Sequence, residues 1–202
     1  MKIALIGATG NVGSRLLAEL TRRNHTVTAI VRQPDKVPTQ PGVTAKKGDV
    51  LDPQGLAELL KGHDAVISSV QFISGDPRQL LEAVRASGVK RYLIVGGAGS
   101  LEVAPGVRLV DTPNFPEAYK AEAIAGGAFL DRLRGEKGLD WTFLSPSALF
   151  VAGERTGKFR LGEDQLLTNT EGSRISFEDF AIALVDELEK PAHSRQRFTV
   201  GY

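Results

Sequence analysis

The sequence predicts an α/β fold with a doubly wound, mostly parallel sheet. Short apolar runs that suit buried strands alternate along the chain with segments of helical periodicity. Strands that alternate with helices in this way build parallel sheets. At 202 residues the chain has a length typical of one such domain. The first strand and helix, residues 2–23, carry the strongest evidence.

Three glycines, Gly7, Gly10 and Gly13, follow the first predicted strand at a spacing of three. A glycine at position 7 permits a tight turn, one at 10 lets a diphosphate approach the backbone, and one at 13 lets the helix pack closely. The free N–H groups and positive dipole end of that helix attract phosphate. The pattern therefore indicates a nucleotide site, and a plain glycine-rich turn is the alternative. We expect the diphosphate to be held by Gly7, Thr9, Gly10, Asn11 and Val12.

The end of the second predicted strand, residues 25–32, indicates which dinucleotide binds. An acidic residue at this strand end binds the ribose 2′-hydroxyl, whereas an arginine suits a 2′-phosphate. The strand ends in Arg32, with Lys36 one turn further on and no Asp or Glu at or just before position 32. A guanidinium can grip phosphate with two parallel hydrogen bonds. The sequence therefore favours NADP(H), with NAD(H) possible, and a solvated charge at the strand end is the alternative.

Further cofactor contacts are expected where later strands end, because sheets of this kind bind ligands at their carboxyl edge. Asp49 and Val50 close a third strand, where the aspartate either faces the adenine amino group or only forms a turn, and the valine packs on the ring. The fourth strand, residues 64–70, is expected to end beside the first glycine turn. The fifth, residues 90–95, ends in glycines that suit backbone contact with a flat ligand, with a flexible loop as the alternative. The candidates at these two ends are Ser68, Ser69, Val70, Gly96 and Gly97.

The sixth predicted strand, residues 139–145, begins the far side of the site. Pro146 and Ser147 follow it and, together with Gly97, are expected to border the nicotinamide. We predict no catalytic side chain that acts as an acid or a base.

The remaining segments complete the predicted organisation. Residues 1–202 form a single domain of the Rossmann type, in which residues 147–175 are a small insertion on the substrate side. Within that lobe, residues 157–161 and 165–168 are predicted to pair as a hairpin. Residues 101–116 contain three prolines and no clear period, which indicates an ordered loop over the site.

The acid–base pair of short-chain dehydrogenases, a tyrosine four residues before a lysine, is absent. The positions four residues after Tyr92 and Tyr119 hold Gly96 and Ala123, and Tyr202 is the last residue. Chemistry that protonates an alkoxide is therefore disfavoured. Hydride transfer to a flavin needs no protein acid, because water can supply the proton. The protein then has to bind the dinucleotide, stack the acceptor and exclude water.

Composition and charge exclude several other functions. The chain holds 25 basic and 24 acidic residues, a formal net charge of +1 that predicts no nucleic-acid or membrane partner. The absence of cysteine excludes disulfides and thiol chemistry, and the three histidines, expected at the surface, lack metal spacing. No signal peptide or membrane-spanning apolar run is present, so we expect a cytoplasmic protein, either a monomer or a weak homodimer.

Motifs along the whole chain resemble the atypical short-chain dehydrogenase/reductase group. The chain is similar to bacterial NADH-flavin reductases and, more distantly, to biliverdin reductase B and NmrA-like proteins. The resemblance implies a Rossmann fold, a reduced nicotinamide cofactor and a flavin-type acceptor such as FMN or FAD. Biliverdin reductase B has a serine and a histidine where this chain has Gly97 and Ser147, which disfavours tetrapyrrole reduction. The matching motifs are residues 7–13, 31–32, 48–50, 96–101, 111–113, 140–146 and 173–176.

Three functions therefore remain open. The first is an NAD(P)H-dependent oxidoreductase that transfers hydride to a flavin-type or similar flat acceptor. The second is an NmrA-like redox sensor that binds NADP(H) without turnover, which the missing tyrosine–lysine pair suits equally well. The third is epimerase-like chemistry of an atypical short-chain dehydrogenase.

Overall fold

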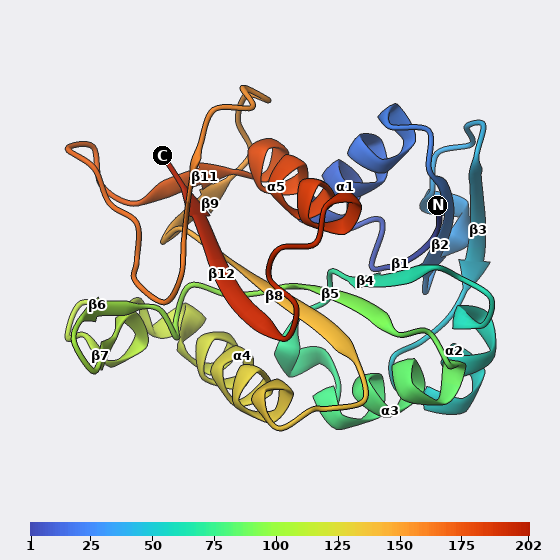
Figure 1. Ribbon diagram of the computed structural model, residues 1–202, viewed down its shortest axis with the longest axis horizontal. Coiled ribbons are helices and arrows are strands. Elements are labelled where there is room, and N and C mark those ends of the chain that lie inside the picture. Colours follow the sequence, from blue (N-terminus) through green and yellow to red (C-terminus); the bar gives the residue numbers. More distant parts are fainter. The chain divides into compact units, whose positions relative to one another are not determined.

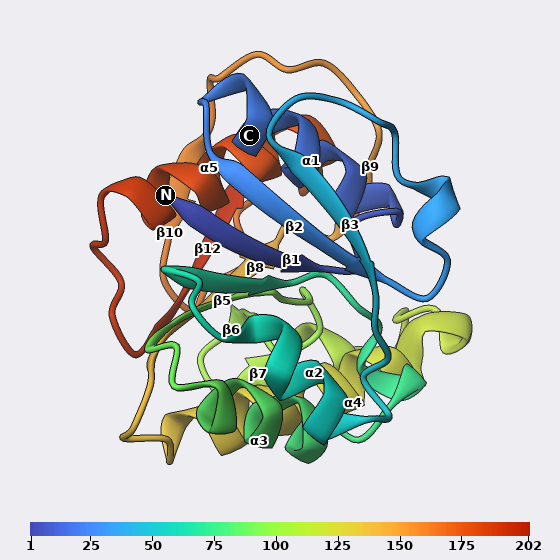
Figure 2. The same cartoon turned by 90° about the vertical axis from the view of Figure 1, so that its right-hand side faces the viewer.

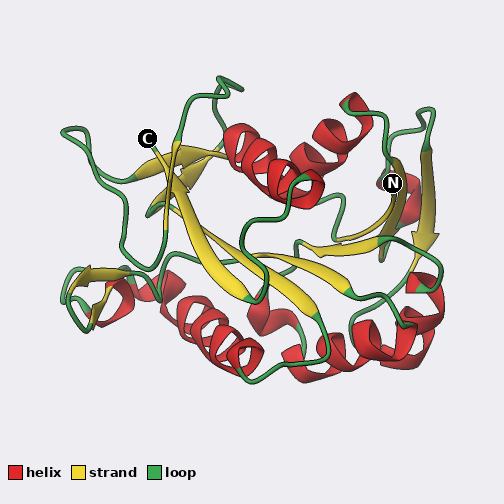
Figure 3. Cartoon of the chain, in the orientation of Figure 1, coloured by secondary structure: helices red, strands yellow, loops and turns green.

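The computed structural model describes residues 1–202 and has a Rossmann-like α/β fold (Figure 3). Backbone hydrogen bonds join eight strands into one mostly parallel sheet in the order β10-β12-β8-β5-β4-β1-β2-β3. The chain divides into two compact units. One comprises residues 1–94 and 137–141, and the other comprises residues 95–136 and 142–202.

In the first unit, parallel pairing joins β1 to β2 and β4, β2 to β3, and β4 to β5. Helix α1 covers one face of these strands, and α2 and α3 lie side by side on the other (Figures 1 and 2). Strands covered on both faces are mostly apolar, and four of the five residues of β1 are buried. The elements are β1 (Lys2–Ile6), α1 (Asn11–Arg22), β2 (Thr26–Val31), β3 (Val43–Lys47), α2 (Pro53–Leu60), β4 (Ala65–Ser68), α3 (Pro77–Ser87) and β5 (Arg91–Val95).

In the second unit, β12 pairs in parallel with β8 and antiparallel with β10. Helices α4 and α5 lie on opposite sides of β8 and β12 (Figure 1). No helix of the protein combines the length and apolar character needed to cross a bilayer. The elements are β6 (Glu102–Ala104), β7 (Val107–Arg108), α4 (Glu117–Arg134), β8 (Asp140–Pro146), β9 (Leu149–Val151), β10 (Arg160–Gly162), β11 (Arg174–Ser176), α5 (Phe177–Glu189) and β12 (Gln196–Gly201).

Two segments of the second unit differ from the prediction. The loop expected at residues 101–116 contains a hairpin, β6–β7, which turns at Pro105 and Gly106, where φ is +74°. The hairpin predicted from residues 157–168 is wrong, because β10 pairs with β12 and Gln165 bridges to Glu102. Pairing with β12 gives that strand a partner on its outer edge, which a local hairpin would leave open. The predicted insertion at residues 147–175 lies wholly within the second unit.

Candidate functional site

The turn after β1 requires two of its three glycines for its own geometry. Gly7 has a φ of +84°, and a Cβ there would lie 2.1 Å from the Ser69 carbonyl oxygen. A Cβ at Gly13 would lie 2.0 Å from the Gly7 carbonyl oxygen. These positions therefore serve the tight turn and the close helix packing, as their spacing predicts.

Gly10, in contrast, is not required by local packing. Its φ of −73° and ψ of 172° suit any residue, and the nearest atom to an added Cβ is the Gly7 oxygen at 3.4 Å. Gly10 also begins α1 without a side-chain cap, and the first turn of α1 has no acidic residue. Asp52, Asp76 and Ser176 cap α2, α3 and α5, and α4 has Glu117 in its first turn. The start of α1 is thus the one helix start left open to an external anion.

A diphosphate fits this open start of α1. The helix N–H groups and dipole favour an anion, and the bare Gly10 lets phosphate oxygens reach the backbone. The predicted contacts Thr9 and Asn11 are exposed beside it. Sequence analysis missed Arg15, whose Nη1 donates to the Asn11 carbonyl at 3.3 Å. Arg15 is the fifth residue of α1, so its guanidinium is a cation close to this helix start.

The strand ends predicted to contact the adenosine half also lie in the first unit. Arg32 is exposed directly after β2, and the Lys36 amide donates to the Gln33 carbonyl at 3.1 Å in a tight 3₁₀ turn. Asp49 Oδ1 accepts the Leu51 amide at 3.0 Å, so the turn role considered for this aspartate is present. The neighbouring residue Val50 is half-buried and borders Gly75, and its packing on adenine stays a prediction.

The end of β4 lies beside the glycine turn, as predicted. The prediction that Ser68 contacts the cofactor, however, is corrected. Ser69 and Val70 flank Gly7, whereas the Ser68 side chain is buried and its hydroxyl bonds the Tyr92 phenol at 2.9 Å. Burial raises the pKa of Tyr92 well above its usual range, so this phenol stays neutral. The Ser68 hydroxyl belongs to the core and is not available to a ribose.

Three glycines follow β5 in the second unit, and the surroundings of their backbone differ. A Cβ at Gly96 would lie 2.2 Å from the Phe143 ring, and one at Gly99 would lie 2.5 Å from the Ala123 Cβ. These two glycines are therefore explained by packing. An added Cβ at Gly97 would meet no atom within 4 Å. Of these three glycines, only Gly97 has open space on the side where a side chain would point.

Alanine substitutions should separate these two roles. We expect Gly96→Ala to lower the free energy of unfolding by about 1–3 kcal/mol, because its Cβ overlaps the Phe143 ring and the Leu144 carbonyl. Gly97→Ala should change stability by less than about 1 kcal/mol. Urea unfolding of both variants measures the difference, and equal losses would contradict these assignments.

The two residues predicted to follow the sixth strand are buried. Pro146 is buried, and Ser147 is fully buried, with its hydroxyl donating to the Val200 carbonyl at 3.0 Å. The prediction that Ser147 borders the nicotinamide is corrected, because its hydroxyl holds β8 to β12. The nearest large apolar side chain in the sequence that is exposed is Leu149, at 53%.

A buried carboxylate that sequence analysis missed organises the loop after β9. Asp179, fully buried on α5, accepts the Thr156 and Gly157 amides, each at 2.8 Å, and the Thr156 hydroxyl at 2.6 Å. The Tyr202 phenol donates to it at 2.8 Å, and the phenol oxygen lies 2.9 Å from the Ser176 hydroxyl. Burial is the main cause that raises the pKa of Tyr202, which keeps the phenol protonated as a donor.

A buried guanidinium ties together the segments around Gly97. Arg197 on β12 donates through Nε to Asp164 at 2.7 Å, and its Nη1 lies 3.2 Å from the Ser100 hydroxyl and 3.4 Å from that of Ser145. Its side chain is only 3% exposed. The loop that carries Gly97 is therefore anchored at Ser100 to a strand almost one hundred residues later.

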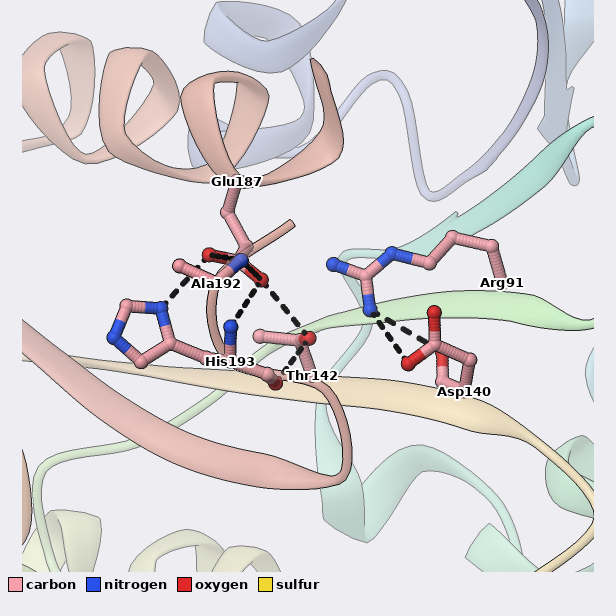
Figure 4. A network of polar contacts seen from close by, with 6 residues as sticks. All are labelled: Arg91, Asp140, Thr142, Glu187, Ala192 and His193. Carbon is pink, nitrogen blue, oxygen red and sulfur yellow. Dashed lines mark hydrogen bonds and ion pairs between the residues drawn. The ribbon is translucent and has the colours of Figure 1, made fainter. Parts of the chain in front are cut away.

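Figure 4 shows two polar groups that are not candidates for catalysis. Arg91 binds Asp140 at 3.4 Å, and both residues stand first in their strands. Separately, Glu187 accepts the His193 ring nitrogen at 2.8 Å and its amide at 2.9 Å, and Thr142 donates to the His193 carbonyl at 2.8 Å. These contacts lie near strand starts, whereas ligands of such sheets bind at strand ends, so we assign both groups to stability.

The other two histidines also have structural roles. His25 is only 8% exposed, so the expectation that it lies at the surface is wrong. His63 Nε2 bonds the Thr28 hydroxyl at 2.8 Å. No group of three or more His, Cys, Asp or Glu side chains is arranged to hold a metal ion.

The fold and the open glycine cradle together define a dinucleotide-binding protein of the Rossmann class. Comparison with known families agrees, because residues 7–191 match the model of the NAD(P)H-binding family. The chain belongs to that family, and its cofactor is a nicotinamide dinucleotide.

Individual relatives cover the whole chain. The “Uncharacterized protein YwnB” of Bacillus subtilis is 44% identical and aligns with 99% of this chain and 98% of its own. A structure from Bacteroides thetaiotaomicron, described as a “putative epimerase”, is 45% identical, covers 100% and 96% of the two chains, and has a TM-score of 0.94. SP1627 of Streptococcus pneumoniae, described as “a putative NADH-flavin reductase”, is 37% identical, covers 100% and 99%, and has a TM-score of 0.87.

Proposed function

We propose that this protein is an NAD(P)H-dependent oxidoreductase that transfers hydride to a flavin-type or similarly flat acceptor. The observation that carries the proposal is the open space beside the Gly97 backbone, directly after β5. The bare backbone of Gly97 suits contact with a flat ring, and no tyrosine–lysine pair stands ready to protonate an alkoxide. The similarity to SP1627 supports the same reaction class.

The first unit binds the cofactor in this proposal. The open start of α1 and the bare Gly10 hold the diphosphate, and Arg32 with Lys36 holds a ribose 2′-phosphate, so NADPH is preferred to NADH. A bound reduced nicotinamide supplies the hydride that a flavin accepts together with a proton from water. The chain's part is then to position the two rings and exclude competing water.

In this proposal the acceptor binds against the backbone around Gly97. The packing of Gly96 and Gly99 fixes the backbone on both sides of Gly97, so this surface is preorganised. Arg197 anchors the same loop through Ser100. A rigid, bare backbone surface favours a planar acceptor over a branched one.

Anaerobic mixing of the purified protein with NADPH and FMN, FAD or riboflavin tests the proposal. We expect the absorbance of the reduced nicotinamide and of the oxidised flavin to fall together, in a one-to-one ratio. NADPH that binds tightly but is never oxidised would instead favour the redox-sensor function. Turnover of a sugar nucleotide without net NADPH oxidation would favour the epimerase alternative, which the similarity to the B. thetaiotaomicron protein supports.

Arg32→Ala should weaken NADPH binding far more than NADH binding. Loss of a charged hydrogen bond to the 2′-phosphate costs about 1.5–3 kcal/mol, or roughly 10–150-fold in dissociation constant. Titration calorimetry with both cofactors measures the difference. Lys90→Ala is the matched control, because Lys90 is an exposed cation before the start of β5, away from the strand ends that bind ligands. Equal weakening of both cofactors would exclude the 2′-phosphate role.

A further inference from the structure

The first turn of α4 carries an aromatic side chain that no structural role explains. Tyr119 is 68% exposed, the largest exposed fraction among the exposed large apolar and aromatic side chains. All five residues from Glu117 to Ala121 are exposed, so no other element packs around this turn. The turn nevertheless belongs to a helix whose later turns are firmly packed, with Gly126, Gly127 and Phe129 buried.

The packing of α4 shows which way Tyr119 faces. An added Cβ at Gly99 would lie 2.5 Å from the Ala123 Cβ, and one at Gly127 would lie 3.7 Å from the Ser100 Cβ. Ala123 and Gly127 are four residues apart and share one face of the helix. Tyr119 is four residues before Ala123 and continues the same row, one turn nearer the start of the helix.

The loop after β5 packs against this row of α4. Moving back from Ser100 to Gly99 corresponds to moving back from Gly127 to Ala123. Ala98 to Leu101 form a turn, in which the Leu101 amide donates to the Ala98 carbonyl at 2.9 Å, and Gly97 directly precedes this turn. On the helix, Tyr119 lies one turn before Ala123. Helical side chains also lean toward the helix N-terminus, which carries the phenol beyond the packed turns. Tyr119 is therefore the exposed side chain of this row that comes next beyond the contacts between α4 and the loop that carries Gly97.

From this placement we propose that Tyr119 stacks on the planar acceptor that binds against Gly97. The inference rests on the proposed function for its ligand class, an isoalloxazine ring. A bare peptide on one side and an aromatic face on the other are two surfaces that suit a flat ring and discriminate against a non-planar acceptor. Tyr119 acts here as a specificity-determining residue, without a role in proton transfer.

Equilibrium binding of FMN to the protein saturated with NADP⁺ tests this inference without requiring turnover. Quenching of flavin fluorescence gives the dissociation constant for wild type, Tyr119→Phe and Tyr119→Ala. We expect roughly a tenfold weaker FMN affinity in the alanine variant, and a change of less than about twofold in the phenylalanine variant, because stacking needs the ring and not the hydroxyl. NADP⁺ affinity and thermal stability should be unchanged in both.

Ile124→Ala is the matched control. Ile124 is 55% exposed on the same helix, but it lies about 140° around the helix axis from Tyr119, so its removal should leave FMN affinity unchanged. Equal FMN binding by wild type and Tyr119→Ala overturns the inference. So does an alanine variant whose only change is its oligomeric state in sedimentation, because a second copy of the chain would then cover Tyr119.

The outcomes separate this inference from the proposed function. If wild type binds FMN through Tyr119 but does not oxidise NADPH, the reductase function fails and the stacking role stands. If wild type reduces FMN with an affinity that Tyr119→Ala does not change, the function stands and the stacking role fails. If wild type does not bind FMN at all, the stacking role is excluded.

Discussion

Replacing Asp179 with alanine is expected to lower the free energy of unfolding by about 3–5 kcal/mol. The substitution removes the charged acceptor of four hydrogen bonds, which the Thr156 and Gly157 amides, the Thr156 hydroxyl and the Tyr202 phenol donate. Hydrogen bonds to a charged group contribute about 1.5–3 kcal/mol each, so the loss of all four is a large effect. In a chain of this length the melting temperature should fall by roughly 10 °C. Thermal unfolding followed by circular dichroism measures the change.

Asp186→Ala controls for loss of a carboxylate from the same helix. Asp186 is exposed two turns later on α5, and we expect its removal to cost less than about 1 kcal/mol. Asp179→Asn should fall between the two, because its amide keeps an acceptor oxygen but presents an N–H group to neighbouring donors. A melting temperature that Asp179→Ala leaves unchanged would show that this loop is not held by the buried carboxylate.

The second large effect concerns the glycine turn, where two similar substitutions should have opposite consequences. Gly13→Ala is expected to destabilise the fold by about 3 kcal/mol or more, because its Cβ would lie 2.0 Å from the Gly7 carbonyl oxygen and 2.9 Å from its carbon. Gly10→Ala should cost less than about 1 kcal/mol of stability. Its methyl group, however, occupies the approach of the diphosphate. We expect NADPH affinity to fall roughly 10–100-fold as charged hydrogen bonds are lost.

Both variants require two measurements, the melting temperature without ligand and the dissociation constant of NADPH. Arg32→Ala serves as a reference, because it should weaken NADPH without lowering the melting temperature. If Gly10→Ala bound NADPH as well as wild type does, the diphosphate could not lie against this backbone.

The element types were largely predictable because the pattern is regular. The run from Lys2 to Ile6 predicts a buried strand, and it is β1. The β6–β7 hairpin was missed although Pro105 and Gly106 are a typical turn signal, because its strands have only three and two residues and no readable alternation. The wrong hairpin at residues 157–168 reflects a choice between partners that local sequence cannot make: β10 pairs with a strand near position 200.

Site residues were predictable where backbone geometry imposes a residue type. Gly7 and Gly13 have the structural roles that their spacing indicates. Side-chain direction was less accessible, because Ser68 and Ser147 stand at predicted strand ends and yet turn inward to buried partners. The Asp179 cluster could not be predicted in full. Its capping-box pattern indicates only a helix start, and its other donors come from distant segments.

The anchoring of residues 147–175 bears on how this family can diversify. Side chains in that stretch bind residues outside it: among them, Asp164 holds Arg197 on β12, and Thr156 holds Asp179 on α5. If residues 147–175 alone were replaced by those of a relative, the new side chains would lack their matching buried partners on α5 and β12. Variation in acceptor preference should therefore be inherited as a matched set that includes α5 and β12, and recombination breakpoints are tolerated more easily ahead of β8 than within the last sixty residues.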